Sequence, residues 1–383
     1  MNNWRHTRAI LVIRLDEIGD VVMTTPFLRE LRRNAPQDWI TLVVNPHALN
    51  LVELCPYVDE VLTFDGRTRG RAQRLKRIAR MLRLGATRFW RRRFDLAVIP
   101  RWGVDYYHAT ELAYVSGARH RVAYSEKVSD RKRQINAGFD RMLTDVLADG
   151  SAKHEVQHGL DCVRYLGGEV MDAQLEVWLD GQDGSFAARV FAEHGLTPGD
   201  PVIAFAPGAR YGTKQWPIER FAELGRLLPD EYQPCVVVGG PDVRPLGERL
   251  KSELGARIIN LAGRTTLRQT AAVLARCCLT VSNDSGPMHL AAAVGSPVVE
   301  IAWHAQGSSP AHPDSPARFH PWGVPHVVVQ PERAKAPCRG SCESSVPHCI
   351  LGVDTSQVLA AARDLLGAGG RVDTTTGAVL CIS

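Results

Sequence analysis

At 383 residues the chain is too long for one ordinary hydrophobic core, which excludes a small single domain and predicts two domains. Its 45% hydrophobic and 23% charged residues are typical of a soluble globular protein, and its net charge of +5 is modest. No apolar run approaches the ~18 residues of a membrane span, and the run at 9–13 is too short for a signal peptide. We therefore expect a cytoplasmic protein.

Short apolar segments alternate with helical patterns along the first half of the chain. Continuous Val, Ile and Leu strands separated by helices predict a parallel sheet that is covered on both faces. The candidate strands are 9–15, 40–45, 58–64, 94–100 and 120–124.

The second half repeats this plan, with helical patterns that include 219–228 and 266–276. The predicted fold is therefore α/β, with two doubly wound Rossmann-like domains facing a central crevice, where ligands bind beyond the carboxyl ends of the strands. The candidate strands of this half are 202–206, 235–239, 258–261, 279–282, 298–302 and 327–329.

A stretch rich in Gly and Asp, 180–185, predicts a linker near the middle of the chain. We expect an N-terminal domain at 1–183, a C-terminal domain at 184–355, and a helix with a tail at 356–383. That last helix shows no evident partner in the second half, and one arrangement has it cross back to the first domain.

The first polar loop follows the strand that ends at Leu15, and a helix is expected to begin near Asp20. Gly19 allows a ligand to approach the backbone closely, and Asp16 suits either a first-turn charge or a contact to an acceptor hydroxyl. Asp20 is a candidate general base toward a sugar hydroxyl, with a low pKa expected at a helix start. A simple N-cap role is the alternative for Asp20, and the spacing alone favours that role.

A second polar loop, 207–217, follows the strand at 202–206 and precedes a helix expected to start at Pro217. Lys214 is a compact positive charge that can neutralise a leaving phosphate, and an ordinary surface lysine is the alternative. Two glycines, Arg210 and Thr213 beside a strand end favour the functional role. Asp242 follows another strand end, where binding a base or ribose and capping the helix at 244–250 are equally supported.

The most informative stretch is 281–293, in which a buried strand enters an Asn-Asp-Ser-Gly turn and a helix follows. Pro at the start of that helix and Gly past its end fit the usual asymmetry of helix termini. The backbone N–H groups of Ser285 and Gly286 then form an anion site at the helix N-terminus. Asp284 and His289 flank this site, and neither is needed to fold the turn. We expect a diphosphate and a polyhydroxylated group to bind here together.

A run of twelve basic residues contains no acid between 66 and 94. Because a solvated helix face normally mixes charges of both signs, the run favours an anionic partner such as a membrane lipid or a phosphorylated glycolipid. Nucleic acid is disfavoured because few aromatic residues interleave with the charges. The residues are Arg67, Arg69, Arg71, Arg74, Lys76, Arg77, Arg80, Arg83, Arg88, Arg91, Arg92 and Arg93.

Three cysteines, Cys338, Cys342 and Cys349, fall in a predicted loop. Their spacing lacks the paired knuckles of a zinc ribbon, so structural thiols are expected, with a soft metal site completed by Cys381 as the alternative. No two aspartates are separated by a single residue, so the D-x-D metal clamp of many sugar transferases is missing and no catalytic metal is expected. No G-x-G-x-x-G follows a strand, which argues against a dinucleotide cofactor.

Together these motifs resemble glycosyltransferase family 9, the ADP-heptose:lipopolysaccharide heptosyltransferases. The similarity runs from residue 10 to about 366 and rests on Gly19-Asp20 with 24–26, on 207–209 with Lys214 and 216–217, and on 283–289. The resemblance implies a GT-B fold and an inverting, metal-independent transfer of a heptose from an ADP-sugar-type donor. The implied acceptor is a hydroxyl of the lipopolysaccharide core or of another glycan.

The resemblance also implies roles for single residues. Asp20 matches the catalytic base of the first, acceptor-binding domain, and Lys214 matches the basic group that faces the donor diphosphate in the second. The donor-binding candidates are Ala209, Arg210, Thr213, Lys214, Asp242, Asp284, Ser285, Gly286 and His289. The acceptor-binding candidates are Asp16, Gly19 and Arg101. No cofactor is expected because ADP-heptose is a substrate, and the basic run suggests peripheral contact with an anionic inner-membrane surface.

Three other functions fit parts of this pattern. A glycosyltransferase that acts on a soluble natural product shares the fold, and so does a nucleotide-sugar epimerase or hydrolase. A non-catalytic module that binds membranes through its basic run is the third. The set of Asp20, Lys214 and Asp284 argues against the last.

Overall fold

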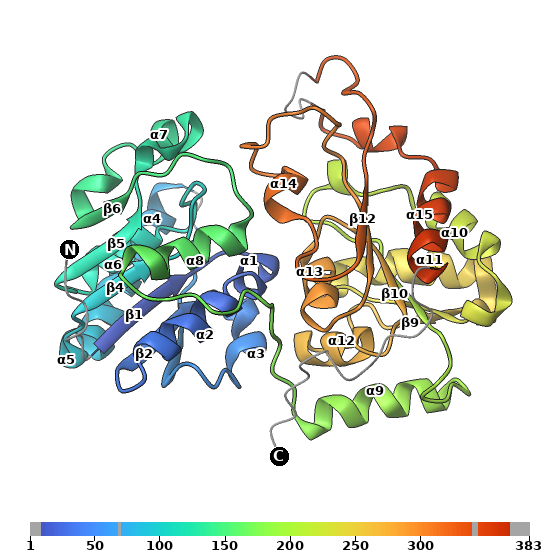
Figure 1. The fold of residues 1–383 in the computed structure, drawn as a ribbon, viewed down its shortest axis with the longest axis horizontal. Coiled ribbons are helices and arrows are strands. Elements are labelled where there is room, and N and C mark those ends of the chain that lie inside the picture. The colour runs from blue at the N-terminus through green and yellow to red at the C-terminus, as the bar shows by residue number, and fades with distance from the viewer. Residues whose placement is uncertain (1–8, 68–69, 339–343, 368–383) are drawn as a thin grey trace. The chain divides into compact units, whose positions relative to one another are not determined.

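The computed structural model describes residues 9–67, 70–338 and 344–367, and the chain divides into two compact units, Met1–Ala173 and Gln174–Ser383 (Figure 1). The division lies upstream of the predicted 183/184 boundary. The predicted linker at 180–185 is instead the start of helix α9 (Gly181–Glu193). Asp180 is the N-cap, and its side chain accepts hydrogen bonds from the backbone N–H groups of Gln182 and Asp183. Gly and Asp are common both in linkers and at helix starts, and composition alone does not separate the two.

The first unit contains a six-stranded parallel sheet in the order β3-β2-β1-β4-β5-β6. Its strands are β1 (Ala9–Arg14), β2 (Trp39–Val44), β3 (Glu60–Thr63), β4 (Leu96–Ile99), β5 (His120–Tyr124) and β6 (Asp145–Leu147). Its helices are α1 (Ile18–Val22), α2 (Thr25–Asn34), α3 (Leu49–Val52), α4 (Arg71–Leu84), α5 (Trp90–Arg92), α6 (Ala109–Val115), α7 (Asp130–Ile135) and α8 (Glu155–Tyr165). Strand β6 was not predicted, because three residues are too few to show a period.

Helices cover both faces of this sheet. Helices α2 and α8 pack together over one face, and α6 packs on β1, β4 and β5 from the other (Figure 1). Alternate residues of β1 serve the two faces, and Leu11 and Ile13 join a core with Met81 of α4 and Leu112 of α6. Every residue of β1 is buried, which explains why its sequence is continuously apolar up to Arg14.

The second unit repeats the architecture, with the order β12-β11-β10-β7-β8-β9. Its strands are β7 (Ile203–Ala206), β8 (Cys235–Val237), β9 (Ile258–Asn260), β10 (Leu279–Asn283), β11 (Val298–Ile301) and β12 (His326–Val329). The helices after α9 are α10 (Ile218–Leu227), α11 (Arg244–Leu254), α12 (Leu267–Leu274), α13 (Gly286–Ala293), α14 (Pro316–Phe319) and α15 (Thr355–Gly367). Two parallel α/β sheets confirm the predicted fold class.

Helix α15 finds a partner in the second unit that its sequence did not reveal. It packs against α10 and strands β10 to β12. Its buried side chains, which include Val358, Leu359 and Ala362, belong to the core that β7 and β10 also line. None of the helices within the described ranges is both long and apolar enough to cross a membrane.

Candidate active site

Both sheets reverse their strand order at an equivalent point. Counted within each unit, the strands run 3-2-1-4-5-6, so the switch lies between β1 and β4 and between β7 and β10. In open α/β sheets, ligands bind beyond the carboxyl ends of the strands at such a point. The segments that follow β1 and β4 carry Asp16, Asp20 and Arg101, and those that follow β7 and β10 carry Lys214 and Asp284.

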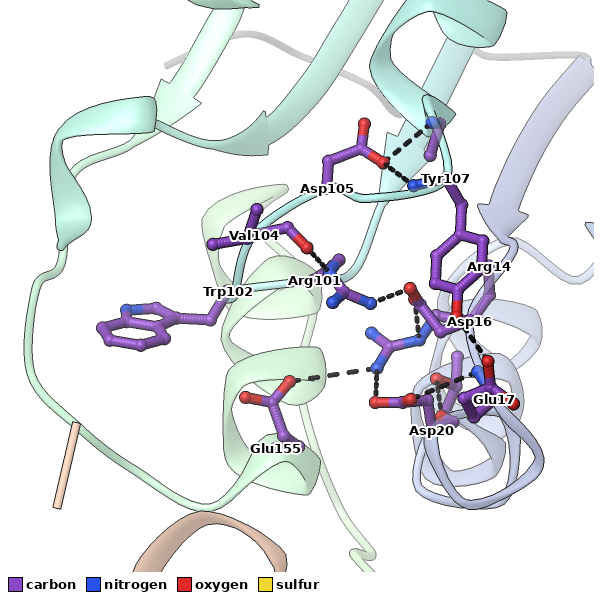
Figure 2. A network of polar contacts seen from close by, with 12 residues as sticks. Arg14, Asp16, Glu17, Asp20, Arg101, Trp102, Val104, Asp105, Tyr107 and Glu155 are labelled. Atoms are coloured by element: carbon purple, nitrogen blue, oxygen red, sulfur yellow. Dashed lines mark hydrogen bonds and ion pairs between the residues drawn. The ribbon is translucent and has the colours of Figure 1, made fainter. Parts of the chain in front are cut away.

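In the first unit, a buried arginine gathers three carboxylates (Figure 2). Arg14, the last residue of β1, is 2% exposed. Its Nε lies 3.0 Å from Oδ2 of Asp16, and its Nη2 lies 2.9 Å from Oδ1 of Asp20 and 3.9 Å from Oε2 of Glu155. Arg14 also donates to the carbonyl of Pro100, the residue that follows β4. These bonds fix both Asp16 and Asp20 at the carboxyl end of the sheet.

Arg101 joins the same network from the neighbouring loop. Its guanidinium pairs with Asp16 and donates from Nε to the carbonyl of Val104 at 2.6 Å. Burial, followed by repulsion from Arg14, lowers the pKa of Arg101 to about 10. The Tyr107 hydroxyl donates to Oε1 of Glu17 across the same region (Figure 2). The structure thus brings Asp16, Asp20 and Arg101 together.

Asp20 occupies a different position in its helix from the one expected. Helix α1 begins at Ile18 with Glu17 as its N-cap, so Asp20 is the third helical residue and accepts from the N–H of Glu17 at 3.3 Å. Burial raises the pKa of Asp20, Arg14 opposes the shift, and Glu155 and Glu17 add to it. The expected low pKa is therefore wrong, because desolvation outweighs the helix terminus and the arginine. A raised pKa improves a carboxylate as a proton acceptor near neutral pH.

In the second unit, the centre is a lysine. Lys214 ends the short helix η6 (Gly212–Lys214), and its Nζ donates to Oδ2 of Asp284 at 2.7 Å and to Oδ1 of Asp314 at 2.8 Å. Lys214 is only 9% exposed, which excludes the alternative of an ordinary surface lysine. Burial disfavours its charge, but Asp284 and Asp314 outweigh burial and raise the pKa of Lys214. The site therefore holds a permanent cation.

Asn283 holds the two loops of this site together. It is fully buried, its Oδ1 accepts from the backbone N–H of Trp216 at 3.1 Å, and its Nδ2 donates to the carbonyl of Pro207 at 2.7 Å. Gly208 allows the loop after β7 to pack closely on Val243, because a Cβ at this position would lie only 2.3 Å from a methyl group of Val243. The loops after β7, β8 and β10 are thus fixed against one another.

Buried polar atoms without a hydrogen-bond partner gather around Lys214 and Asp284. Among the described residues they include Nδ1 of His289, Oε2 of Glu300 and Nε2 of His304. Burial lowers the pKa of His289 to about 4 and raises that of Glu300 well above its usual range, and both groups interact electrostatically with Asp284. Such groups each cost about 1–3 kcal/mol when left unsatisfied, which makes this region a candidate site for a polar ligand.

The remaining donor-binding candidates lie in the segments that follow β7, β8 and β10. Ser285 is the N-cap of α13, so the helix begins at Gly286. The Ala209 carbonyl accepts from the Gln215 side chain at 3.2 Å, and Thr213 is half-buried beside Lys214.

Arg210 is exposed, with its guanidinium 5.3 Å from the centre of the Tyr211 ring. Asp242 is exposed in the short helix η8 (Pro241–Val243), and Val243, not Asp242, is the N-cap of α11. Gly19 is buried within α1.

Several residues of the two centres were not predicted. A charged residue at the end of a buried strand, as at Arg14, or within one, as at Glu300 of β11, is a signal that the sequence contains. Glu155 comes from α8 and Asp314 from the loop between β11 and α14, and nothing in their local sequence links them to the site.

The basic run at 67–93 is less uniform than its sequence suggests. Arg77 is buried and pairs with Glu111 at 2.9 Å, while Arg88 and Arg92 lie 3.6 and 3.9 Å from the carboxylate of Glu60. The carboxylates that pair with these arginines therefore come from Glu60 and Glu111, outside the basic run. Arg69, Cys342 and Cys381 lie outside the described residues.

Comparison with known proteins identifies the family of this chain. The family model of glycosyltransferase family 9 (heptosyltransferase) matches residues 100–346. The chain belongs to glycosyltransferase family 9. It is 25% identical to lipopolysaccharide heptosyltransferase 2 of Salmonella typhimurium, over 94% of this chain and 99% of the relative. Over 106 residues it is 36% identical to lipooligosaccharide heptosyltransferase 2 of Haemophilus influenzae, a match that covers 26% of this chain and 31% of that protein.

The solved structure of Escherichia coli ADP-heptose lps heptosyltransferase II is similar in fold. The TM-score is 0.69 at 23% identity, and the match covers 95% of this chain and 100% of that chain. The expected GT-B fold is confirmed. Membership of the family makes this chain a heptosyltransferase-like glycosyltransferase, which decides against an epimerase, a hydrolase and a non-catalytic module.

Proposed function

We propose that this family 9 enzyme transfers a heptose from ADP-heptose to a hydroxyl of a lipopolysaccharide-core glycan, with inversion and without a metal ion. The Salmonella typhimurium relative is named a lipopolysaccharide heptosyltransferase, and the Escherichia coli structure is named for ADP-heptose. The observation that carries the proposal is the buried Lys214, paired with Asp284 at the switch point of the second sheet.

The donor diphosphate is proposed to bind at the N-terminus of α13, where Ser285 and Gly286 present backbone N–H groups. Lys214 supplies the positive charge that a divalent metal supplies in other transferases. Negative charge grows on the leaving phosphate oxygen during transfer, and a preorganised donor aimed at such an oxygen contributes ~2.7–4 kcal/mol. Asp284 is proposed to accept hydrogen bonds from hydroxyls of the donor sugar.

The proton acceptor is proposed to be Asp20. Its carboxylate takes the proton of the acceptor hydroxyl while that oxygen forms a bond to the anomeric carbon. The bond from this carbon to the phosphate oxygen breaks on the opposite side, and ADP leaves with the electron pair. Attack opposite to the leaving group inverts the anomeric configuration. Arg14 holds Asp20 for this step through the 2.9 Å contact.

Donor binding has an electrostatic consequence at Lys214. Its ammonium already faces two carboxylates, and a diphosphate adds further negative charge. We expect the ion pair between Asp314 and Lys214 to break, because the side chain of Asp314 is 30% exposed whereas that of Asp284 is 14% exposed. The displaced Asp314 carboxylate would then be available to sugar hydroxyls.

The test is a transfer assay with the purified full-length chain, ADP-heptose and lipopolysaccharide cores truncated before the heptose. We expect ADP release that depends on the acceptor, survives excess chelator, and gives a product of inverted anomeric configuration by NMR. ADP release without acceptor, or a loss in chelator that magnesium or manganese restores, would overturn the mechanism. Transfer only to a soluble small-molecule acceptor would overturn the acceptor class.

We further propose that α4 contacts an anionic membrane surface. Leu75, Ile78 and Leu82 recur at helical spacing and are 69%, 37% and 48% exposed. Exposed basic residues, Lys76 and Arg83 among them, lie on the same helix. A helix that combines an exposed apolar stripe with basic residues is typical of one that lies in a lipid interface.

Co-sedimentation with anionic and neutral vesicles across a salt series tests this contact. Replacing Leu75 and Leu82 with Ser should weaken binding, and Leu227→Ser, at a residue that is 46% exposed on α10, is the matched control. Arg77 is left intact because its change would break the buried pair with Glu111. Equal binding by the Leu75/Leu82 variant and the control would leave α4 as an ordinary solvated helix.

A further inference from the structure

Two cysteines and a histidine converge in the loop that follows β12. The ligand atoms of Cys338, His348 and Cys349 all lie within 4.8 Å of one another. Nδ1 of His348 is 3.8 Å from Sγ of Cys338 and 3.6 Å from Sγ of Cys349. Both cysteines are buried, and the histidine is half-buried. Cys338 and His348 are ten positions apart in the sequence, so the fold and not sequence proximity brings them together.

Hydrogen bonding alone accounts poorly for this arrangement. One imidazole nitrogen offers a single proton or a single lone pair, yet two sulfur atoms approach the same Nδ1 at similar distances. A tetrahedral metal with bonds of about 2.3 Å to sulfur and about 2.0 Å to nitrogen separates these ligand atoms by about 3.5 Å. The two Nδ1-to-Sγ separations, 3.8 and 3.6 Å, are close to that value.

We propose that Cys338, His348 and Cys349 bind a soft or borderline metal ion of the zinc or ferrous iron class. Thiolate and imidazole ligands in tetrahedral geometry select these ions over magnesium or calcium. The backbone N–H of Lys335 donates to Sγ of Cys349 at 3.4 Å, an interaction that stabilises a metal-bound thiolate. The expectation of structural thiols overlooked His348, because a search for cysteine spacing does not include a lone histidine.

The position of these ligands points to a structural role. The metal would join the turn at 335–338 to the short helix η10 (Cys349–Gly352), in which Ile350 is fully buried. The carbonyl of the next residue, Val353, accepts from Nε1 of Trp216 at 2.8 Å. Trp216 is bonded in turn to Asn283 through its backbone N–H. The metal would therefore stabilise the segment that holds Trp216, and through it the loop that carries Lys214. It would not take part in transfer.

Metal content of the purified full-length chain is the first test. Protein exposed to Zn²⁺ and, without oxygen, to Fe²⁺ should retain a stoichiometric amount of one of them after dialysis. The identity of the retained ion shows whether the site prefers zinc or ferrous iron. Reconstitution with Co²⁺ should give thiolate-to-metal absorption and the intense bands of a tetrahedral ion. Wild-type protein that retains neither ion, or a cobalt spectrum without thiolate bands, would overturn the proposal.

The variants Cys338→Ser and Cys349→Ser should lose the metal, and His348→Gln should weaken its retention and alter the cobalt spectrum. Cys278→Ser, at a half-buried cysteine outside the cluster, is the matched control and should keep both. Where a Ser variant fails to fold, chelator treatment of the wild type should lower its melting temperature. Retention of the metal by both Ser variants would overturn the proposal. None of these readouts depends on transfer, so failure here is distinct from failure of the proposed reaction.

Discussion

The two units place opposite charges on equivalent loops. The segment after the first strand of each unit carries Asp20 in one unit and Lys214 in the other. The segment after the fourth strand carries Arg101 in one and Asp284 in the other. One strand order therefore supports a carboxylate centre held by arginine and an ammonium centre held by carboxylates. The fold provides the place, and the side chains decide the chemistry.

The two centres also differ in how burial acts on them. In the first unit burial dominates and raises the pKa of Asp20 despite Arg14. In the second unit two carboxylates overcome burial and keep Lys214 charged. The first arrangement suits a group that gains a proton during the reaction, and the second suits a group whose charge stays constant. This contrast can be tested from both sides.

The largest effect is expected from Asp20→Asn. Asn can still accept the N–H of Glu17 but cannot take a proton, so kcat should fall by about 10²–10⁴-fold with little change in donor affinity. The measurement is steady-state transfer together with calorimetric binding of ADP-heptose. Asp16→Asn is the matched control, since it removes a carboxylate from the same arginine but leaves the proposed base. Near-normal turnover of Asp20→Asn would make Asp20 a helix-capping residue.

Lys214→Gln should follow, with a fall in kcat of about 10²–10³-fold and weaker donor binding. The loss reflects the missing charge opposite the leaving phosphate oxygen. Asp314→Asn provides the contrast, because it removes a competitor for Lys214 and should strengthen binding of ADP alone. ADP affinity that is unchanged in both variants would show that the diphosphate does not contact Lys214.

The sequence was sufficient to predict those features of the two centres that depend on a local pattern of residues. Strand β1 is a continuous apolar run that ends in a charged residue. The turn at the end of β10 is indicated by four consecutive residues, 283–286. The partners that tune each centre were out of reach, since Glu155 and Asp314 reach it only through tertiary packing. Burial was also invisible: the same Asp20 at a helix start predicts a low pKa in solvent and a raised one when desolvated.

An intermediate effect is expected from Asn283→Ala. The change leaves the carbonyl of Pro207 and the N–H of Trp216 without this partner, each at a cost of about 1–3 kcal/mol. The protein should melt earlier, and KM for the donor should rise because the loop of Lys214 is released. Asn260→Ala is the matched control, as it removes another buried asparagine of the same unit. A similar rise in KM for both variants would reduce Asn283 to a general stabilising role.

The smallest effect concerns the pH dependence of the first centre. Asp20 must be ionised to accept a proton, so kcat/KM should increase as pH rises through its pKa, above the range of an ordinary aspartate near ~3.9. The negative charge of Glu155 contributes to raising that pKa, after burial. Glu155→Gln removes this charge, so the pKa of Asp20 should fall and the acid limb should move to lower pH by roughly one unit or less.

Glu30→Gln is the matched control for this shift, because Glu30 is a buried carboxylate of the same unit that is not among the main causes of the raised pKa of Asp20. The readout is the pH profile of kcat/KM for the three proteins under identical salt. A general loss of stability would lower activity at every pH and would not displace the limb. An acid limb that stays fixed in Glu155→Gln would therefore mean that another group sets it, and the assignment of Asp20 as the base would lose its electrostatic support.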